Sequence, residues 1–210
     1  MSNQEPEESR PGRVVVITGG SAGIGLEIAR RRATAGDRIL ITGRHQSALD
    51  AALLGLGTGV ALAVDAGHPD AADLVVDAAL TAYGALDVIV ASAAHIPPQG
   101  SLIDANDADI DAAWQTNVAA PLRLVRAAWS RAMCQSGGNI VMMGSLGGQA
   151  FQPDMGLYCV TKAALHHLTR ILAAELGPMV RVNAVAPGMI RTEGARVAWE
   201  PAENMVRARS

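Results

Sequence analysis

The stretch Arg13-Val-Val-Val-Ile-Thr-Gly-Gly-Ser-Ala-Gly-Ile-Gly25 decides the fold. Its first half is a continuous β-branched run, which is typical of a strand buried on both faces of a parallel sheet. Its second half is a glycine-rich turn, and helical periodicity continues from there through Ile28 to Gly36. Glycine lets a backbone approach a ligand closely, and a helix start offers free N–H groups and the positive end of the helix dipole. The turn therefore suits a pyrophosphate, with these candidate contacts: Gly19, Ser21, Gly23, Ile24 and Gly25.

The same alternation of strand and helix repeats along the chain. Further strands are predicted at Arg38–Thr42, Val60–Val64, Leu86–Ala91, Asn139–Met143 and Val180–Val185. Ala-rich helices are predicted at Ser47–Leu54, Ala71–Tyr83, Ala108–Met133 (one helix or two) and Met155–Leu176. Parallel neighbours require crossover connections, so the pattern predicts an α/β protein with a doubly wound parallel sheet, a Rossmann fold, in a single domain. Ligands of such sheets bind outside the carboxyl ends of the strands.

Length and composition limit the classes of protein to consider. The chain has 210 residues, 50% of them hydrophobic and 18% charged, which suits one domain with a sizeable core. Its net charge is -3 and its basic residues are scattered, which argues against nucleic acid as a partner. Residues 1–12 are polar and acidic and are interpreted as a flexible tail ahead of a dinucleotide-binding catalytic domain at 13–210. No apolar stretch reaches the roughly 20 residues that span a bilayer, so no membrane contact is expected.

The two cysteines bear on location and on metal binding. Cys134 and Cys159 have no paired spacing and no neighbouring histidine that would make a metal site. A reducing cytoplasm is the expected location, and no metal is expected.

The ends of the second and third strands bear on the choice of coenzyme. Folds that bind NAD usually carry an acidic residue near the end of the second strand for the ribose 2′-hydroxyl, whereas an arginine suits the 2′-phosphate of NADP. Here the acid is absent and Arg44 is present, which favours NADP(H) and keeps NAD(H) as the alternative. A surface arginine in such a loop is also commonplace. Asp65, which ends the third strand, either hydrogen-bonds an adenine amino group or caps the following turn. A tightly packed turn without a ligand is the alternative for the glycine-rich segment itself.

Tyr158 and Lys162 are four residues apart on a predicted helix, so they lie on one face within reach of each other. Tyrosine ionises at about pH 10, but an adjacent ammonium stabilises the phenolate and brings it toward the range useful for proton transfer. Ser145 lies just past the fifth strand, and Asn117 lies in the preceding helix. A serine hydrolase is the competing interpretation, but the segment from 143 to 147 lacks the G-x-S-x-G elbow.

Together with Asn183-Ala-Val-Ala-Pro-Gly188 and Thr192, these motifs resemble those of the short-chain dehydrogenase/reductase family over residues 13–192. The resemblance implies an NADP(H)-dependent oxidoreductase that passes hydride between nicotinamide and a small-molecule carbonyl or alcohol. The cofactor contacts that it adds are Ala93, Pro187, Gly188 and Thr192, with Thr192 at the nicotinamide carboxamide.

The same resemblance implies a role for each candidate catalytic residue. It makes Tyr158 the acid/base and Ser145 the group that polarises the substrate carbonyl. It has Lys162 hold the nicotinamide ribose and lower the pKa of the tyrosine, and it has Asn117 organise a proton-relay water. The walls of the substrate pocket are expected from the loops at 146–155 and 189–199.

Two departures from the family pattern follow. Where the family usually shows Asn-Asn-Ala-Gly, this chain has Ala91-Ser-Ala-Ala94, so Ser92 is expected to replace in part the amides that tie the central sheet. The family also continues after the Thr192 loop into another helix and a seventh strand, so we expect a C-terminally shortened member. A cofactor-binding protein with weak or no catalysis is the alternative. Val180–Val185 is then an exposed edge, which the segment with Trp199 either covers or leaves open.

The remaining aromatic and histidine residues complete the expectations. Trp114 and Trp129 are assigned to helix packing or to a subunit contact, and the two long helices are expected to form a homodimer. By resemblance His95, with Ile96, lines the substrate pocket, and an ordinary loop histidine is the alternative. His166 and His167 are adjacent on a helix and point to different faces, so both are assigned to solvent or an interface rather than to a shared metal.

Overall fold

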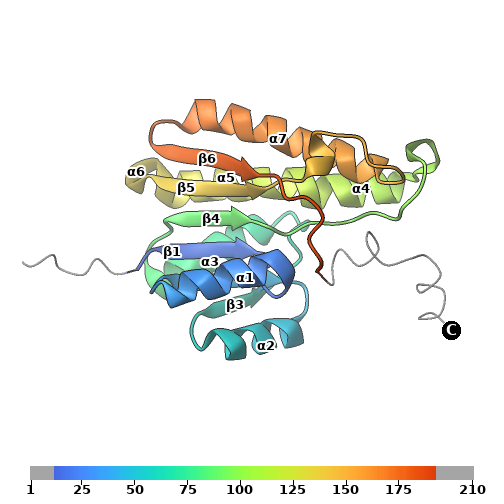
Figure 1. Cartoon of the computed structure of the whole chain (residues 1–210). Coiled ribbons are helices and arrows are strands. Elements are labelled where there is room, and N and C mark those ends of the chain that lie inside the picture. Colours follow the sequence, from blue (N-terminus) through green and yellow to red (C-terminus); the bar gives the residue numbers. More distant parts are fainter. Residues whose placement is uncertain (1–11, 193–210) are drawn as a thin grey trace, which may run out of the picture.

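Six parallel strands form one sheet at the centre of the protein (Figure 1). The computed structural model describes residues 12–192. The strands are β1 (Val14–Thr18), β2 (Arg38–Gly43), β3 (Val60–Ala63), β4 (Val88–Ala91), β5 (Gly138–Met143) and β6 (Val180–Val185). Their spatial order is β3-β2-β1-β4-β5-β6, so the chain runs outward from β1 to β3 and then returns to place β4 on the other side of β1. The predicted doubly wound parallel sheet is confirmed.

The helices connect the strands and cover the sheet. They are α1 (Gly23–Thr34), α2 (Gln46–Leu56), α3 (Ala71–Tyr83), α4 (Asp107–Trp114), α5 (Ala120–Ala128), α6 (Cys134–Ser136) and α7 (Gly156–Leu176). Two π-helical segments, Gln115–Ala119 and Trp129–Met133, join α4 to α5 and α5 to α6. The predicted helical region at Ala108–Met133 is therefore one helical run with two wider turns. Short 3-10 turns lie at Leu102–Asp104 and Leu146–Gly148.

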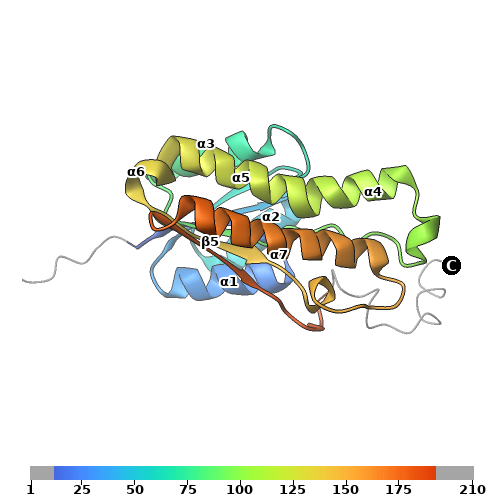
Figure 2. The same ribbon diagram turned by 90° about the horizontal axis from the view of Figure 1, so that it is seen from above.

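The alternation of side chains along β1 explains why its sequence is apolar throughout. Val15 and Ile17 point to the face that packs against α1 and α2, and Val16 points to the face covered by α3, α5 and α7. All three side chains are fully buried. Figure 2 shows α1 on one side of the sheet, with α5 and α7 on the other. The three-layer arrangement buries both faces of the central strands, as a parallel sheet requires.

The reversal of strand order brings two loops together. β1 pairs with both β2 and β4, and Thr18 at the end of β1 lies opposite Ala91 at the end of β4. The glycine-rich turn after β1 and the segment after β4 therefore leave the sheet side by side. In open α/β sheets this switch point is where ligands bind.

The predicted boundaries differ from the observed ones mainly at β4. The predicted strand begins at Leu86, whereas β4 begins at Val88. Leu86 is 2% exposed and packs in the core, so its apolar character reflects burial rather than strand pairing. The helix predicted at Ser47–Leu54 is longer by a residue or two at each end.

β6 lies at an edge of the described sheet, as predicted, and within residues 12–192 no seventh strand pairs with it. Arg181 and Asn183 are exposed along it, and Val185 is 51% exposed. The predicted N-terminal tail, apart from Gly12, and the segment with Trp199 lie outside the described residues. Among the described helices, none combines the length and apolar character needed to cross a membrane.

Candidate active site

A cleft of about 630 Å³ lies over the carboxyl ends of the strands at the switch point. Every predicted site residue except Asn117 lines it: Gly19, Ser21, Gly23, Ile24, Gly25, Arg44, Asp65, Ala93, Ser145, Tyr158, Lys162, Pro187, Gly188 and Thr192. The two loops predicted to form the substrate wall also line the cleft. The first contributes Gln152 and Met155, and the second contributes Met189 and Ile190. His95 and Ile96 also line it. Tertiary folding therefore brings the glycine turn and the Tyr-Lys pair, more than 130 residues apart in the numbering, into one concave site.

The glycine turn leaves the start of α1 open to this cleft. Ala22 is the N-cap residue and provides no side-chain hydrogen bond, and the first turn of α1 holds no acidic residue. The first N–H groups and the positive dipole end therefore lack a compensating group from the helix itself. The turn is also tightly packed, because a Cβ at Gly25 would lie 2.3 Å from the Gly19 carbonyl oxygen. Close packing and an open anion site coexist here.

The two candidate contacts for the adenosine end differ in their surroundings. Arg44 is exposed at the rim of the cleft, and its guanidinium has no hydrogen bond or ion pair with any residue in 12–192. The Asp65 carboxylate also lines the cleft, but its Oδ1 accepts a hydrogen bond of 2.9 Å from the Gly67 N–H. Asp65 thus caps its own turn, the second of the two interpretations drawn from the sequence.

Tyr158 and Ser145 are hydrogen-bonded to each other at the centre of the cleft. Burial raises the pKa of the Tyr158 phenol above its ordinary value, and the hydrogen bond from Ser145 lowers it by a smaller amount. We expected Lys162 to lower this pKa. Its Nζ atom lies 5.6 Å from the centre of the Tyr158 ring, but desolvation of the phenolate outweighs any such effect in the protein alone. Burial therefore sets the direction of the shift in the protein without its coenzyme, and the lowering by Lys162 stays a prediction.

Lys162 is itself buried, with an exposure of 2%. Burial lowers the pKa of its ammonium to about 8. Nζ donates a hydrogen bond of 2.8 Å to the backbone carbonyl of Met143, at the end of β5. This carbonyl fixes the end of the lysine side chain at the floor of the cleft. No sequence signal identified Met143, because its contribution is a main-chain atom.

Asn117 lies beneath the cleft rather than in its lining and is 1% exposed. Its Oδ1 accepts from the His95 N–H at 2.8 Å, and its Nδ2 donates to the His95 carbonyl at 2.8 Å and to Thr161 Oγ1 at 3.0 Å. Both amide hydrogens are thereby used. The side chain ties the segment after β4 to α7, so a proton-relay water would have to be held by another atom of this residue.

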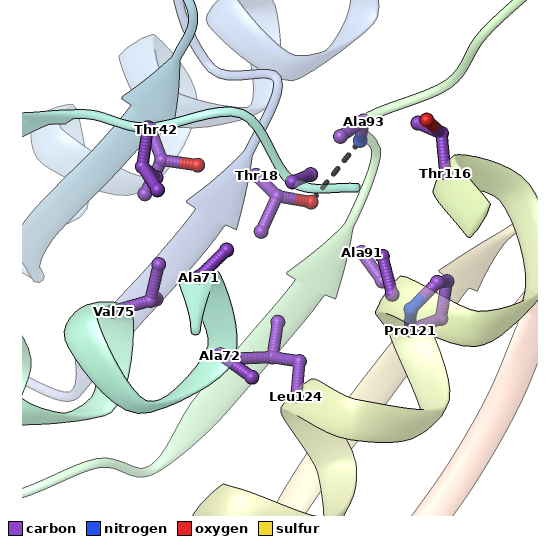
Figure 3. Close-up of a pocket in the computed structure, with 13 residues that line it drawn as sticks. Thr18, Thr42, Ala71, Ala72, Val75, Ala91, Ala93, Thr116, Pro121 and Leu124 are labelled. Atoms are coloured by element: carbon purple, nitrogen blue, oxygen red, sulfur yellow. Dashed lines mark hydrogen bonds between the residues drawn. The ribbon is translucent and has the colours of Figure 1, made fainter. Parts of the chain in front are cut away.

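The segment from Ala91 to Ala94 is held by Thr18 rather than by the side chain of Ser92. Thr18 Oγ1 accepts hydrogen bonds of 3.1 Å from the N–H groups of both Ser92 and Ala93. Figure 3 shows the bond to Ala93 at the top of a small cavity between α3, α5 and the sheet. The cavity measures about 20 Å³ and is lined mainly by alanine, threonine and other small side chains, Ala91 included. It offers room for about one water molecule.

The sequence assigned His166 to solvent or to an interface, but its ring contacts the protein's own Ser145 loop. It is half-buried, and its Nε2 accepts a hydrogen bond of 3.3 Å from the Ser145 N–H. The usable signal was its spacing from Lys162, since residues four apart share a helix face. His167 is exposed, in agreement with the expectation, and its ring contacts Arg170. The side chain of His95 lines the cleft, and its buried Nε2 has no hydrogen-bond partner within the described part of the chain.

The fold and this cleft define a protein of the dinucleotide-binding, doubly wound class. A family profile described as short chain dehydrogenase matches residues 13–203. The chain belongs to the short-chain dehydrogenase/reductase family, whose members are NAD(P)-dependent oxidoreductases acting on CH–OH groups.

Relatives and solved structures agree with this assignment. Mouse dehydrogenase/reductase SDR family member 4 is 34% identical over 193 residues, covering 90% of this chain and 69% of that protein. Tropinone reductase-like 3 of Erythroxylum coca is 34% identical over 188 residues, covering 88% of this chain and 72% of that protein. A short-chain type dehydrogenase/reductase from Mycobacterium ulcerans superposes with a TM-score of 0.85 at 28% identity, covering 92% of this chain and 74% of that one.

Proposed function

We propose that this protein is an NADP(H)-dependent reductase or dehydrogenase of a small carbonyl or alcohol substrate, with Tyr158 as the acid/base. The observation that carries the proposal is the cleft that holds both an open helix N-terminus and the hydrogen-bonded Tyr158 and Ser145. The names of the relatives support the carbonyl and alcohol chemistry, since one is a tropinone reductase-like protein and others are dehydrogenase/reductases.

The residues present fit a dinucleotide at this site. The uncapped start of α1 presents free N–H groups to a pyrophosphate, and the absence of an acid in its first turn leaves nothing to repel it. Arg44 stands at the rim without a partner among the described residues, which supports a contact with a 2′-phosphate and so favours NADP(H) over NAD(H). Pro187, Gly188 and Thr192 would lie at the nicotinamide end, on the loop that follows β6.

When bound, the coenzyme supplies or accepts the hydride. The Ser145 hydroxyl would donate a hydrogen bond to the substrate oxygen and so polarise the carbonyl. The phenol oxygen of Tyr158 gives a proton to that oxygen during reduction and removes it during oxidation. Lys162, a buried cation beside this pair, offsets negative charge on the phenol oxygen and has two N–H donors beyond the one that Met143 uses.

A direct assay tests this function. The purified protein is mixed with NADPH or NADH and a panel of aldehydes, ketones and their alcohols, and absorbance of the reduced coenzyme is followed. Turnover with at least one carbonyl or alcohol is expected. If the protein binds NADPH in a calorimeter but turns over nothing on the panel, the alternative of a cofactor-binding protein with weak or no catalysis replaces the proposal.

Location and assembly belong to the same proposal. The two cysteines are free in the described structure, which suits a reducing cytoplasm. The helices α4, α5 and α7 leave Trp114 45% exposed, and we place the contact of a homodimer on this helical face. Light scattering behind a sizing column measures the mass, and a stable tetramer would rule out the dimer. Fractionation of cells that carry the tagged chain tests the compartment.

A further inference from the structure

We propose that His166 is a positioning residue of the active site, which fixes the loop from Gly144 to Gly148 so that the Ser145 hydroxyl stays against the Tyr158 phenol. The inference rests on the proposed function, because its catalytic consequence is a loss of carbonyl turnover.

The helix places His166 for this task. Tyr158, Lys162 and His166 follow one another at intervals of four residues on α7, so all three side chains lie along the face that meets the end of the sheet. The first two line the cleft, and the third is half-buried one turn further along. His166 therefore lies one turn of α7 beyond Lys162, where its ring contacts the loop that carries Ser145.

Its ring contacts both ends of the turn that carries Ser145. The Ser145 N–H donates to Nε2 at 3.3 Å, and the ring makes a second hydrogen bond to the backbone of Gly148. That second bond raises the pKa of the ring, so the ring is its donor and the Gly148 carbonyl is the acceptor. Because Nε2 accepts, the proton must be on Nδ1. The neutral Nδ1–H tautomer thus bridges the first and last residues of the turn.

The loop is shaped around the ring. A Cβ at Gly144 would lie 2.1 Å from His166 Nε2, and a Cβ at Gly148 would lie 2.8 Å from His166 Cε1. Real Cβ atoms do not approach other atoms so closely, so any other residue at either position would displace the imidazole or the loop. Gly144 therefore leaves space that the histidine fills, and Gly148 leaves space both for the histidine and for the Lys162 backbone carbon, which a Cβ there would meet at 2.7 Å.

The surroundings keep the ring in its accepting form. Burial of the ring is the largest cause that lowers the pKa of His166, followed by the positive charges of Lys162 and Arg170. The residues of the loop that faces the ring, 144–148, contribute no ionisable side chain. A neutral imidazole is the state in which Nε2 can accept from the Ser145 N–H.

The position of Ser145 matters because its hydroxyl has two partners. Ser145 Oγ accepts from the Gly147 N–H at 3.1 Å and is hydrogen-bonded to Tyr158. A small displacement of the turn would misalign this hydroxyl with a substrate carbonyl, and a misplacement of about 1 Å in an active site can lower the rate by about 100-fold. The histidine itself does not touch the reacting atoms.

The first test is kinetic. His166→Phe keeps a ring of similar size and removes both hydrogen bonds, whereas His166→Gln can accept and donate as the imidazole does. With the best carbonyl substrate of the wild type, His166→Phe is expected to lower kcat by at least about tenfold with the Kd for NADPH changed by less than about twofold. His166→Gln is expected to recover most of the kcat. His167→Phe, the same change at the exposed neighbour, is the matched control and should behave as the wild type. A kcat for His166→Phe equal to that of the control would overturn the proposal.

The second test does not depend on turnover or on the folding of the Phe variant. In ¹⁵N-labelled wild-type protein at neutral pH, long-range ¹H–¹⁵N correlations report the tautomer of each histidine, and the signals of His166 are those absent from His166→Gln. The neutral Nδ1–H form is expected, and an Nε2–H or doubly protonated ring would contradict the bridge. If the wild type turned over no substrate, the proposed function would fail while this spectrum still decided whether the bridge exists.

Discussion

The Nζ atom of Lys162 lies 5.6 Å from the centre of the Tyr158 ring, one helical turn further along α7, and donates its hydrogen bond to the Met143 carbonyl rather than to the phenol. The position of the lysine side chain is thus fixed by the end of β5. Ser145 is the group that touches the phenol, and its hydrogen bond lowers the pKa of Tyr158 against the larger effect of burial. The pKa of Tyr158 is therefore set by burial and by a hydroxyl that comes from a different element.

Tyr158→Phe is expected to reduce kcat by about 100-fold or more, because it removes the transferable proton and keeps the ring. The affinity for NADPH should stay within about twofold of the wild type. Tyr83→Phe is the matched control, since Tyr83 is the other tyrosine of the chain and its hydroxyl donates to the Ile39 carbonyl at 2.9 Å, far from the cleft. Steady-state kinetics and calorimetry check both. Retention of most of the rate by the Tyr158 variant would remove it as the acid/base.

Arg44→Ala is expected to weaken NADPH binding by about 10- to 100-fold and to leave NADH binding almost unchanged, because a charge-assisted contact with the 2′-phosphate is lost. Arg30→Ala is the control for the change in net charge. Arg30 is an exposed residue of α1 and does not line the cleft. Calorimetric titration with NADPH and with NADH gives the two affinities of the wild type and of each variant. Equal affinities of the wild type for NADPH and NADH would refute the assigned preference.

Lys162 is the only lysine in the chain, so its titration can be followed directly. With ¹³Cε-lysine incorporated, a single resonance should titrate with a midpoint near the pKa of about 8 that burial imposes. The unfolded chain keeps its proton up to the ordinary lysine pKa, so between that value and pH 8 the unfolded state binds more protons. The contribution of Lys162 to the free energy of unfolding is therefore greatest at high pH and falls as the pH is lowered to about 8. Urea melts of the wild type and of Lys162→Met across this range should show a difference in the free energy of unfolding that changes with pH. An NMR midpoint at the ordinary lysine pKa would show that the ammonium is not desolvated.

Asn117→Ala is expected to lower the free energy of unfolding by about 2 kcal/mol or more, because it leaves the N–H and carbonyl of the half-buried His95 without their partner. Asn139→Ala is the control, since that side chain makes an exposed contact with Arg181, and a change within about 0.5 kcal/mol is expected. Urea denaturation gives both values. A variant at position 117 that kept full stability but lost activity would favour a purely catalytic role for this residue.

Thr18→Val is expected to lower the free energy of unfolding by about 1–3 kcal/mol, because the N–H groups of Ser92 and Ala93 lose their common acceptor. NADPH binding should weaken with it, since Ala93 lines the cleft. Thr42→Val makes the same substitution at another wall of the cavity in Figure 3, where no described residue bonds the hydroxyl, and should cost less. Similar losses of unfolding free energy in the two variants would show that the hydrogen bonds to Thr18 Oγ1 do not contribute to stability.

Much of the fold was predictable because its signals are local. The β-branched run before Gly19 marks a strand buried on both faces, and the period-four spacing of Tyr158 and Lys162 marks one face of a helix. The alternation of such segments implies crossover connections and hence a parallel sheet, with its ligand site at the carboxyl ends. For the same reason almost all candidate site residues could be named in advance, since each lies just beyond a predicted strand or on the helix that follows.

What the sequence by itself determined is therefore the class of fold, the edge at which the site lies and the residue types that meet there. Only the tertiary structure decided which atoms touch. It showed that the amide of Asn117 is fully hydrogen-bonded to His95 and Thr161, and that Thr18 rather than Ser92 holds the segment after β4. It also showed that burial is the largest cause of the shift in the pKa of Tyr158. It also placed His166 in the space beside Gly144. These features depend on main-chain atoms, desolvation and packing between segments distant in the chain, and such quantities are properties of the assembled neighbourhood, whereas periodicity and spacing are properties of a single segment.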